Sequence, residues 1–472
     1  MKDIRFGTDG WREVIAAGFT VDHVARVAWA VARWLVSSAS SPSVVVGHDT
    51  RFGGRMFAET LAKVLSQKGV KVYLSPGVVT TPMLSYGVKV LGARAGLMVT
   101  ASHNAPRYSG IKLKGPHGGP LDAAATRMVE GLVPDVNEVN LPVIRWERRL
   151  QDERVTYTDL EELYYGRVTA RFGEVLRQKA FRPAFDVMYG AALRIVPRLF
   201  PGALLLHGEE NPLFGGMAPD PVPSRLLELS ERMRREGSYD LGVALDGDAD
   251  RVTLLDAGGT CVDAHHLILL LVHHLAGRKN LHGKVVTGIT TTHRLEELCR
   301  RYGLEVQRTP VGFKEVSAVM RQEEVLLGGE ESGSFALPDH LPERDGLWVA
   351  LTVMEAMMET GKSLRQLLDE VEEITGPFAC DRADLPMSDE QRRKVLRRCA
   401  EGAFSAFGPF RVTHMLEFDG YKYFFGDGEW LMVRPSGTQQ LLRLYAEAED
   451  AARVEAILRA AYETLTAEEK HS

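Results

Sequence analysis

Three stretches of the chain repeat one pattern, in which an apolar strand is followed by a polar turn, a helix and a second strand. They cover residues 44–81, 185–206 and 284–306. Two of the second strands end in similar Pro/Gly turns, within 71–77 and 305–312. Because strands that alternate with helices pack as parallel or mixed sheets covered by helices, the pattern predicts three related α/β units.

The C-terminal part of the chain follows another pattern. Strands are expected near 421–425, 430–434 and 442–446, and residues 451–465 have the apolar spacing of an amphipathic helix. Consecutive strands followed by a helix are typical of an α+β domain.

A chain of 472 residues is too long for one hydrophobic core and should divide into domains. We predict the α/β fold class, with three similar α/β domains containing mixed sheets and a C-terminal α+β domain. The expected domains are residues 1–143, 144–255, 256–374 and 375–472.

The composition of the chain excludes several classes of protein. The net charge of -6 provides no basic surface for nucleic acid, and the four cysteines form no CxxC motif of a zinc site. The N-terminus lacks the apolar core of a signal peptide, and the longest apolar run, near Leu267–Val272, is too short to span a membrane. We expect a cytoplasmic protein that binds neither nucleic acid nor membrane.

A polar turn follows the apolar residues Leu97–Val99. Ser102 lies in this turn, between Thr100 and the pair His103 and Asn104. Such a serine alone is typical of a turn or a helix cap, and no histidine and carboxylate are spaced to suggest a catalytic triad. A serine that accepts a phosphoryl group needs a cation that spreads the charge and stabilises its oxygen. Its role therefore depends on a metal site elsewhere in the chain.

A candidate metal site is the loop that contains Asp246, Asp248 and Asp250, between two apolar strands. In extended backbone, carboxylates at i, i+2 and i+4 point the same way and repel one another unless a cation neutralises them. Mg²⁺ takes oxygen ligands and is the usual cation where phosphate is handled. A calcium-binding EF-hand is rejected, because Arg251 takes the place of its glycine and Ala257 that of its final glutamate. Arg251 is a candidate contact for phosphate.

A second candidate phosphate site lies near the C-terminus. Arg434 and Arg443 flank a tight turn that contains Ser436, Gly437 and Thr438. A guanidinium can bind phosphate through two parallel hydrogen bonds, and the turn supplies hydroxyl and backbone donors. A Pro-Ser-Gly turn alone would be structural, but the two arginines favour phosphate binding.

Further candidate residues lie in residues 309–346. Glu330 and Ser332 belong to a glycine-bracketed loop that suits neighbouring sugar hydroxyls, although the same carboxylates suit a solvated surface. Lys314 follows a glycine turn, and His340 precedes a helix that Asp345 should cap. Lys314 and His340 are candidates for acid/base chemistry or phosphate binding.

Five motifs of the chain, in this order, resemble those of the α-D-phosphohexomutase superfamily, which contains the phosphoglucomutases and phosphomannomutases. They are an N-terminal motif, a phosphoserine loop, a metal loop, a sugar-recognition loop and a phosphate loop. The motifs cover Phe6–Arg12, Thr100–Asn104, Asp246–Arg251, Gly329–Gly333 and Arg434–Thr438.

The resemblance implies four domains around a central cleft and a reversible transfer of phosphate within a hexose. Phosphorylated Ser102 would pass its group to the free hydroxyl of glucose 1-phosphate or glucose 6-phosphate. Glucose 1,6-bisphosphate, the intermediate and activator, would turn over and return its other phosphate to Ser102. The resemblance also implies that Asp246, Asp248 and Asp250 bind Mg²⁺ together with an oxygen of Ser102.

The remaining roles are implied in the same way. Arg12, Lys112 and Arg251 would line the transfer site, while Lys112, His103 and Lys314 compete for the role of acid or base. The segment from Arg434 to Arg443 would hold the phosphate that is not reacting, and Glu330 and Ser332 would bind the 3- and 4-hydroxyls of the sugar.

Departures from the family pattern bear on the substrate. Ser334 stands where some bacterial members have histidine, and Gln439–Gln440 replaces a Glu-Pro pair. The pair Glu330 and Glu331 and the segment 339–348 look more like glucomutases than glucosamine mutases. The prediction is a phosphoglucomutase that also accepts mannose phosphates, as a monomer or homodimer. The alternatives are a phosphoglucosamine mutase, a phosphatase or bisphosphate synthase, and a non-catalytic sugar-phosphate sensor.

Overall fold

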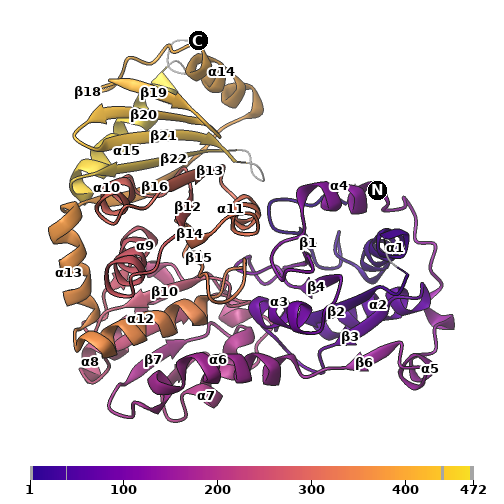
Figure 1. Ribbon diagram of the computed structural model, residues 1–472. Coiled ribbons are helices and arrows are strands. Elements are labelled where there is room, and N and C mark those ends of the chain that lie inside the picture. The colour runs from indigo at the N-terminus through magenta and orange to yellow at the C-terminus, as the bar shows by residue number, and fades with distance from the viewer. Residues whose placement is uncertain (1–3, 39, 437–440, 468–472) are drawn as a thin grey trace. The chain divides into compact units, whose positions relative to one another are not determined.

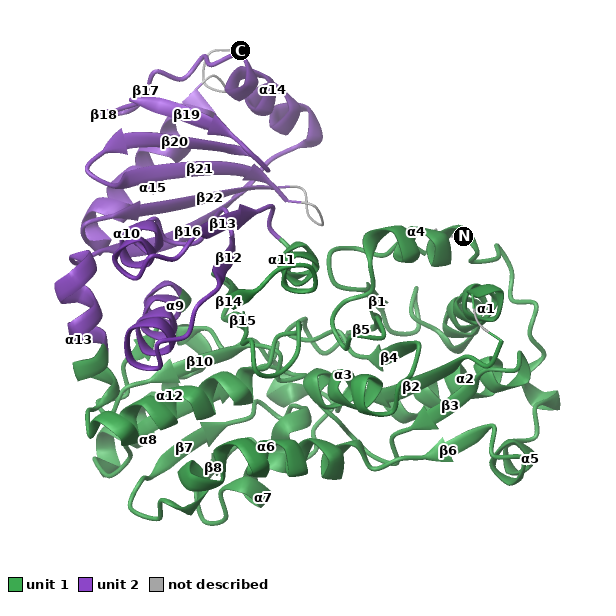
Figure 2. Ribbon diagram, viewed as in Figure 1, with its two compact units in different colours: residues 1–264, 312–367 green, residues 265–311, 368–472 purple. Residues whose placement is uncertain are grey.

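The computed structural model describes residues 4–38, 40–436 and 441–467 (Figure 1). These residues form two compact units, shown in Figure 2. The first unit contains residues 1–264 and 312–367, and the second contains residues 265–311 and 368–472.

The first unit begins with a six-stranded mixed sheet in the order β1-β5-β4-β2-β3-β6. Strands β2, β3, β4 and β6 are parallel, whereas β5 is antiparallel to both β4 and β1. The strand, helix and strand expected within residues 44–81 are confirmed. The strands are β1 (Trp11–Val14), β2 (Ser43–His48), β3 (Lys71–Leu74), β4 (Ala95–Val99), β5 (Tyr108–Lys114) and β6 (Val155–Tyr157).

Helices cover both faces of this sheet. Val44 and Val46 of β2 join the same apolar core as helices α1 (Val21–Ser38) and α2 (Gly54–Gln67). Between these valines, Val45 points to the opposite face, where it approaches α3 (Thr81–Val90) at Gly87. Successive side chains of a strand alternate between faces, so the continuous Val44–Val46 run is explained by burial on both sides. Further helices of this region are α4 (Ala123–Gly131) and α5 (Trp146–Gln151).

A second sheet of the first unit has the order β11-β10-β9-β7-β8. Strands β8, β7 and β9 are parallel, and β10 is antiparallel to β9 and β11. The turn from β9 back to β10 carries the three aspartates. The elements are β7 (Pro183–Asp186), β8 (Leu204–Leu206), β9 (Leu241–Leu245), β10 (Val252–Leu255), β11 (Cys261–Val262), α6 (Leu160–Arg177), α7 (Ile195–Leu199) and α8 (Leu227–Glu236).

The first unit also contains part of the expected third domain, residues 256–374. Strands β14 (Val325–Glu330) and β15 (Ser334–Ala336) form an antiparallel pair that is preceded by helix α11 (Phe313–Met320). Helix α12 (Gly346–Thr360) follows. Asp345 caps it, as predicted, by accepting a hydrogen bond of 3.0 Å from the Trp348 backbone N–H.

The second unit combines a parallel strand pair with an antiparallel C-terminal sheet of order β16-β22-β21-β20-β19. All three strands and the final helix expected in the C-terminal part are confirmed. Helices α9 (Ala264–Val272) and α13 (Leu364–Thr375) begin in the first unit and continue in the second. The other elements are β12 (Lys284–Gly288), α10 (Arg294–Arg301), β13 (Val306–Thr309), β16 (Ala379–Pro386), α14 (Asp389–Ala400), β17 (Ala406–Phe407), β18 (Phe410–Arg411), β19 (His414–Glu417), β20 (Tyr421–Gly426), β21 (Glu429–Pro435), β22 (Leu441–Ala448) and α15 (Ala451–Thr466).

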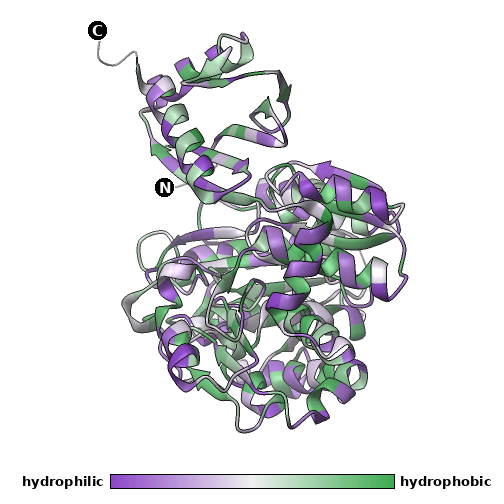
Figure 3. Ribbon diagram, turned by 90° about the vertical axis from the view of Figure 1, so that its left-hand side faces the viewer, coloured by the Kyte–Doolittle hydropathy of each residue, from purple (hydrophilic) through white to green (hydrophobic). Residues whose placement is uncertain are grey.

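Helix α15 has the spacing of apolar residues that is typical of an amphipathic helix. Its buried Val454, Ile457, Leu458, Ala461 and Leu465 recur at helical spacing and belong to one core with the C-terminal sheet. Figure 3 shows both hydrophilic and hydrophobic colours along the helices, as expected where one face is packed. None of the helices in the described ranges is long and apolar enough to span a lipid bilayer.

Candidate active site

Ser102 lies in the turn between β4 and β5 and is almost fully buried. Its φ of 51° places it in the left-handed region, which residues other than glycine rarely adopt. The backbone N–H of Ser102 donates to Thr100 Oγ1 at 2.8 Å, and that of Asn104 donates to the Ala101 carbonyl at 3.0 Å. The turn is therefore held by its own residues as well as by its surroundings.

The structure brings this turn to the aspartate loop between β9 and β10. Ser102 Oγ donates a hydrogen bond of 2.6 Å to Asp246 Oδ2, although the two residues are 144 positions apart. Ligand oxygens of Asp246, Asp248 and Asp250 all lie within 4.8 Å of one another, and all three side chains are buried. The serine and the metal loop thus form one cluster.

The donor set of this cluster fits a divalent cation. Within the described part of the chain, Asp248 Oδ1 and Asp250 Oδ1 are buried without a hydrogen-bond partner. Burial, and then repulsion by Asp248 and Asp250, raises the pKa of Asp246 well above its ordinary value. A hard cation with oxygen ligands would satisfy these oxygens and relieve the repulsion.

Two buried cations complete the cluster. Lys112 Nζ lies 2.9 Å from Asp9, 2.8 Å from Asp248 and 2.5 Å from Asp250. Arg344 Nη2 lies 2.6 Å from Asp9 and 2.7 Å from Asp250. Burial disfavours the charged form of Lys112, but the neighbouring carboxylates outweigh this effect and raise its pKa. The Lys112 ammonium is therefore charged in this arrangement.

Arg12 and Arg251 border the cluster. Arg12 Nη1 donates to Asn104 Oδ1 at 2.5 Å, and Nη2 lies 3.5 Å from Asp9. The Arg251 backbone N–H donates to Asp246 Oδ1 at 3.1 Å, and its side-chain Nη1 lies 3.8 Å from Asp220. Arg251 is thus tied to the metal loop through its backbone, while the ion pair of its guanidinium with Asp220 is long.

His103 lies beside the serine, with Nδ1 3.3 Å from Ser102 Oγ. Burial lowers its pKa well below the ordinary value, and the charges of Arg251 and Arg12 add to this effect. The imidazole is therefore neutral near pH 7. A neutral imidazole can accept a proton, whereas a charged one cannot.

Glu330 lies at the end of β14, where its Oε1 accepts a hydrogen bond of 2.7 Å from the Gly312 N–H. Burial, and then the charge of Glu331, raises the pKa of Glu330 to about 7. Glu331 Oε2 is buried and has no hydrogen-bond partner in the described residues. Ser332 Oγ donates to Ser334 Oγ at 3.0 Å. This loop presents carboxylate and hydroxyl groups that can bind a polar ligand.

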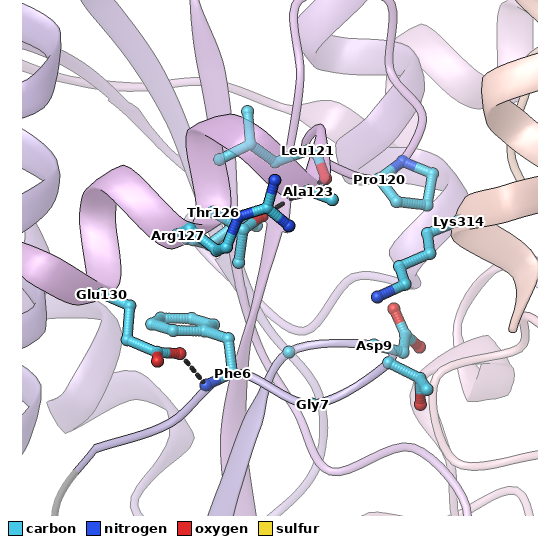
Figure 4. Close-up of a pocket in the computed structure, with 13 residues that line it drawn as sticks. Phe6, Gly7, Asp9, Pro120, Leu121, Ala123, Thr126, Arg127, Glu130 and Lys314 are labelled. Atoms are coloured by element: carbon cyan, nitrogen blue, oxygen red, sulfur yellow. Dashed lines mark hydrogen bonds between the residues drawn. The ribbon is translucent and has the colours of Figure 1, made fainter.

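Lys314 is not part of the ion-pair cluster. It lines a neighbouring cavity of about 240 Å³, whose wall includes Asp9 and residues 120–130. Figure 4 shows the Lys314 side chain extending toward the Gly7–Asp9 segment. Asp9 therefore faces this cavity and also contacts Lys112 and Arg344.

His340 does not join the cluster either. Its buried ring stacks on Trp348 at a centroid distance of 3.8 Å, and its Nε2 lies 2.9 Å from Asp345 Oδ2. Tyr164 donates to the same carboxylate oxygen at 2.7 Å. His340 is thus a packed side chain beside a helix cap, and the substrate-binding role predicted for it stays a prediction.

The second unit contains the predicted phosphate loop. Arg434 and Arg443 lie directly opposite each other on β21 and β22. Arg434 Nε lies 2.9 Å from Asp419, and Arg443 Nε lies 3.8 Å from Asp384. Like charges at facing positions of a sheet repel, and the aspartate beside each arginine reduces this repulsion.

The connection between these two strands is described only in part. The Ser436 backbone N–H donates to the Leu441 carbonyl at 3.1 Å. Gly437 and Thr438, both predicted to bind phosphate, lie outside the described residues.

Several residues of the cluster were not identified from the sequence. Asp9 belongs to the N-terminal motif and Arg344 to segment 339–348, so these two lay within recognised stretches. Thr81 donates to Asp248 Oδ2 at 2.5 Å. Arg51 donates to the Ser102 carbonyl from the polar turn that follows the first strand of residues 44–81. These four residues contact partners that are distant in sequence, so the residues next to them in the chain do not indicate the contacts.

Comparison with known proteins places the whole chain in one family. Family models for the α/β/α domains I, II and III of phosphoglucomutase/phosphomannomutase match residues 3–139, 162–259 and 263–374. The model for the C-terminal domain matches residues 378–464. The matches confirm the four-domain α/β architecture, while the exact boundaries proposed above stay predictions.

Individual relatives agree with this result. The chain is 32% identical to a probable phosphoglucosamine mutase of Methanothermobacter thermautotrophicus, over 94% of this chain and 93% of the relative. It is also 32% identical to a phosphoglucosamine mutase of Deinococcus radiodurans, over 96% of both chains. A crystal structure of a putative phosphomannomutase from Thermus thermophilus matches with a TM-score of 0.84 and 33% identity, covering 98% of this chain and 99% of that one. The chain is therefore a member of the phosphoglucomutase/phosphomannomutase family, within the α-D-phosphohexomutase superfamily of mutases.

Proposed function

We propose that the chain interconverts glucosamine 1-phosphate and glucosamine 6-phosphate through a phosphorylated Ser102. The observation that carries the reaction type is the contact between Ser102 Oγ and Asp246 within a buried triad of aspartates. The choice of sugar is supported by the names of the curated relatives described above. Glucose phosphates, which the sequence alone favoured, become the second candidate.

In this proposal Ser102 is the residue that carries the phosphoryl group between substrates. Asp246, Asp248 and Asp250 would hold Mg²⁺ together with an oxygen of Ser102. Such a cation supplies charge neutralisation and polarises phosphoryl oxygens. Arg12 contacts Asn104 of the Ser102 turn, Arg251 follows the aspartates in the metal loop, and both are suited to orient the incoming phosphate.

A proton must leave the attacking sugar hydroxyl and return in the reverse reaction. His103 lies beside Ser102 and Lys112 contacts Asp250 of the same cluster, whereas Lys314 lines the neighbouring cavity. All three stay candidates for this role. Glucose 1,6-bisphosphate or its amino-sugar counterpart would prime the enzyme by phosphorylating Ser102.

The sugar loop is compatible with an amino sugar. Glu330 is buried, Glu331 has one buried carboxylate oxygen, and burial followed by the charge of Glu331 raises the pKa of Glu330. An ammonium group at C2 of the sugar would neutralise such a pair. The second candidate function, on glucose or mannose phosphates, is favoured by the double glutamate of the same loop and by segment 339–348, which look more like glucomutases.

A substrate panel distinguishes the two. The enzyme would be supplied with Mg²⁺ and a hexose 1,6-bisphosphate and assayed on glucosamine 6-phosphate, glucose 6-phosphate and mannose 6-phosphate. The proposal expects the highest kcat/KM on glucosamine 6-phosphate. A preference of tenfold or more for glucose or mannose, on the order of 1.4 kcal/mol, would establish the second candidate. Release of inorganic phosphate faster than isomerisation would instead indicate a phosphatase.

A further inference from the structure

The turn that holds Ser102 rests on one buried guanidinium. Arg51 lies between β2 and α2, and its side chain has no exposed surface. Its Nη1 donates to the carbonyls of Ala105 at 3.0 Å and Tyr108 at 2.9 Å. Its Nη2 donates to those of Ser102 at 2.5 Å and Asn104 at 2.7 Å. Carbonyl groups from most of the turn thus converge on a single side chain.

A second set of contacts fixes the guanidinium and returns to the serine. Asp49 Oδ1 accepts from the Arg51 backbone N–H at 3.0 Å, and Asp49 Oδ2 lies 3.3 Å from Arg51 Nε. The same Oδ2 accepts from Thr100 Oγ1 at 2.6 Å, and Thr100 Oγ1 accepts from the Ser102 N–H. The ring of Phe214 lies 4.9 Å from the Arg51 guanidinium. The backbone of Ser102 is therefore held on both its N–H and its C=O.

The turn needs such support for two reasons. A left-handed conformation costs a residue with a Cβ atom on the order of 1 kcal/mol. Converging carbonyl dipoles also repel one another unless a donor lies between them. A planar guanidinium has donors enough for all four carbonyls, whereas the compact ammonium of lysine has three and a different geometry.

We infer that Arg51 is a positioning residue of the phosphoryl-transfer site. Resting on the proposed function, the inference is that Arg51 touches neither sugar nor phosphate but holds the Ser102 backbone so that Oγ stays against Asp246. A displacement of about 1 Å at a reacting atom can cost about 10²-fold in rate. Loss of Arg51 should therefore lower kcat far more than it raises KM.

The first test compares Arg51→Lys and Arg51→Ala with a matched control. Arg26 is also buried, and its Nε donates to the Pro134 carbonyl at 2.6 Å, away from the turn. We expect kcat to fall about 10²-fold in Arg51→Ala and about tenfold or more in Arg51→Lys, with KM within about threefold. Arg26→Lys and Arg26→Ala should keep kcat within about threefold. Millimolar guanidinium chloride should restore part of the activity of Arg51→Ala and none in Arg26→Ala.

The second test does not depend on the reaction. Arg107 is exposed and lies between two of the carbonyls held by Arg51, so trypsin cleavage after Arg107 reports whether the turn is fixed. We expect cleavage there to be at least about tenfold faster in Arg51→Lys than in the wild type and in Arg26→Lys. Unchanged cleavage, or a kcat of Arg51→Lys equal to that of the wild type, would overturn the inference. If the wild type converted none of the hexose phosphates, the proposed function would fail, while cleavage at Arg107 would still decide the role of Arg51.

Discussion

The proposed function assigns the same chemical group to the Ser102 site and to the C-terminal phosphate loop, but the two regions are built in opposite ways. Around Ser102, the aspartates, Lys112 and Arg344 are buried and paired with one another. In the phosphate loop, Arg434 and Arg443 keep partial exposure and pair with partly exposed aspartates. A group that reacts must be fixed, because small displacements are costly in rate. A group that only holds a phosphate can remain accessible, because a guanidinium binds phosphate in solvent.

The largest expected effect comes from removing the oxygen that carries the phosphoryl group. Ser102→Ala should lower kcat/KM by on the order of 10⁴-fold or more, since the group itself is lost. Intact-mass measurement should show a phosphate adduct on the wild type and none on the variant. Ser109→Ala, a buried serine on β5, serves as the control and should keep its adduct. Full activity in Ser102→Ala would end the phosphoserine mechanism.

The second prediction concerns the buried ion pairs of Arg344 and their contribution to the free energy of unfolding. Arg344→Met leaves Asp9 and Asp250 without one of their buried partners and should cost about 3–5 kcal/mol of unfolding free energy. Urea denaturation followed by circular dichroism measures this change. A loss below about 1 kcal/mol would show that the charges near Ser102 are no more demanding than those of the phosphate loop.

The titration of Glu330 gives a smaller, pH-dependent effect. Its pKa is raised from about 4.5 to about 7 by burial and then by Glu331. Because the pKa is higher in the folded state, the stability contribution of the proton is fully present below about pH 4.5 and is lost as the pH rises through about 7. Glu330→Gln should remove this dependence, so that the variant gains on the order of 1–3 kcal/mol relative to the wild type between pH 5 and pH 8. Melting temperatures at those two pH values provide the measurement. A constant difference across the range would contradict the assignment.

The smallest stability effect is expected in the phosphate loop. Arg434→Met removes an ion pair with Asp419 and should change the unfolding free energy by no more than about 1 kcal/mol. It should nevertheless raise KM for the sugar phosphate about tenfold, because one of two phosphate anchors is lost. Steady-state kinetics and urea denaturation of the same preparation test both statements. If Arg434→Met lost much stability and kept its KM, Arg434 would be a structural residue and would not bind phosphate.

The sequence predicted most of the fold because its signals are local. The run Val44–Val46, the Asp345 cap and the spacing of Val454, Ile457 and Leu458 each specify an element within a few residues. The strands β16 and β19 were missed, because much of each is exposed and neither carries a continuous apolar run. Their place in the sheet depends on pairing with distant strands.

The candidate site was predicted to the extent that its residues are neighbours in sequence. The aspartates at 246, 248 and 250 lie within one loop, so that their spacing alone indicated a metal site. The contacts among Asp9, Lys112 and Arg344 form only when the chain folds. The sequence around Arg344 does not indicate which carboxylates it will contact. His340 differs from these residues, since its ring is packed against Trp348, and its predicted role in substrate binding stays a prediction.

The left-handed backbone of Ser102 has a consequence for protein engineering. Glycine adopts this conformation without steric cost, so a chain selected for heat resistance alone would favour glycine at this position. Under the proposed function, screens that score variants by melting temperature will therefore enrich substitutions at Ser102 that abolish turnover. Stabilisation of this enzyme is better sought outside residues 100–110.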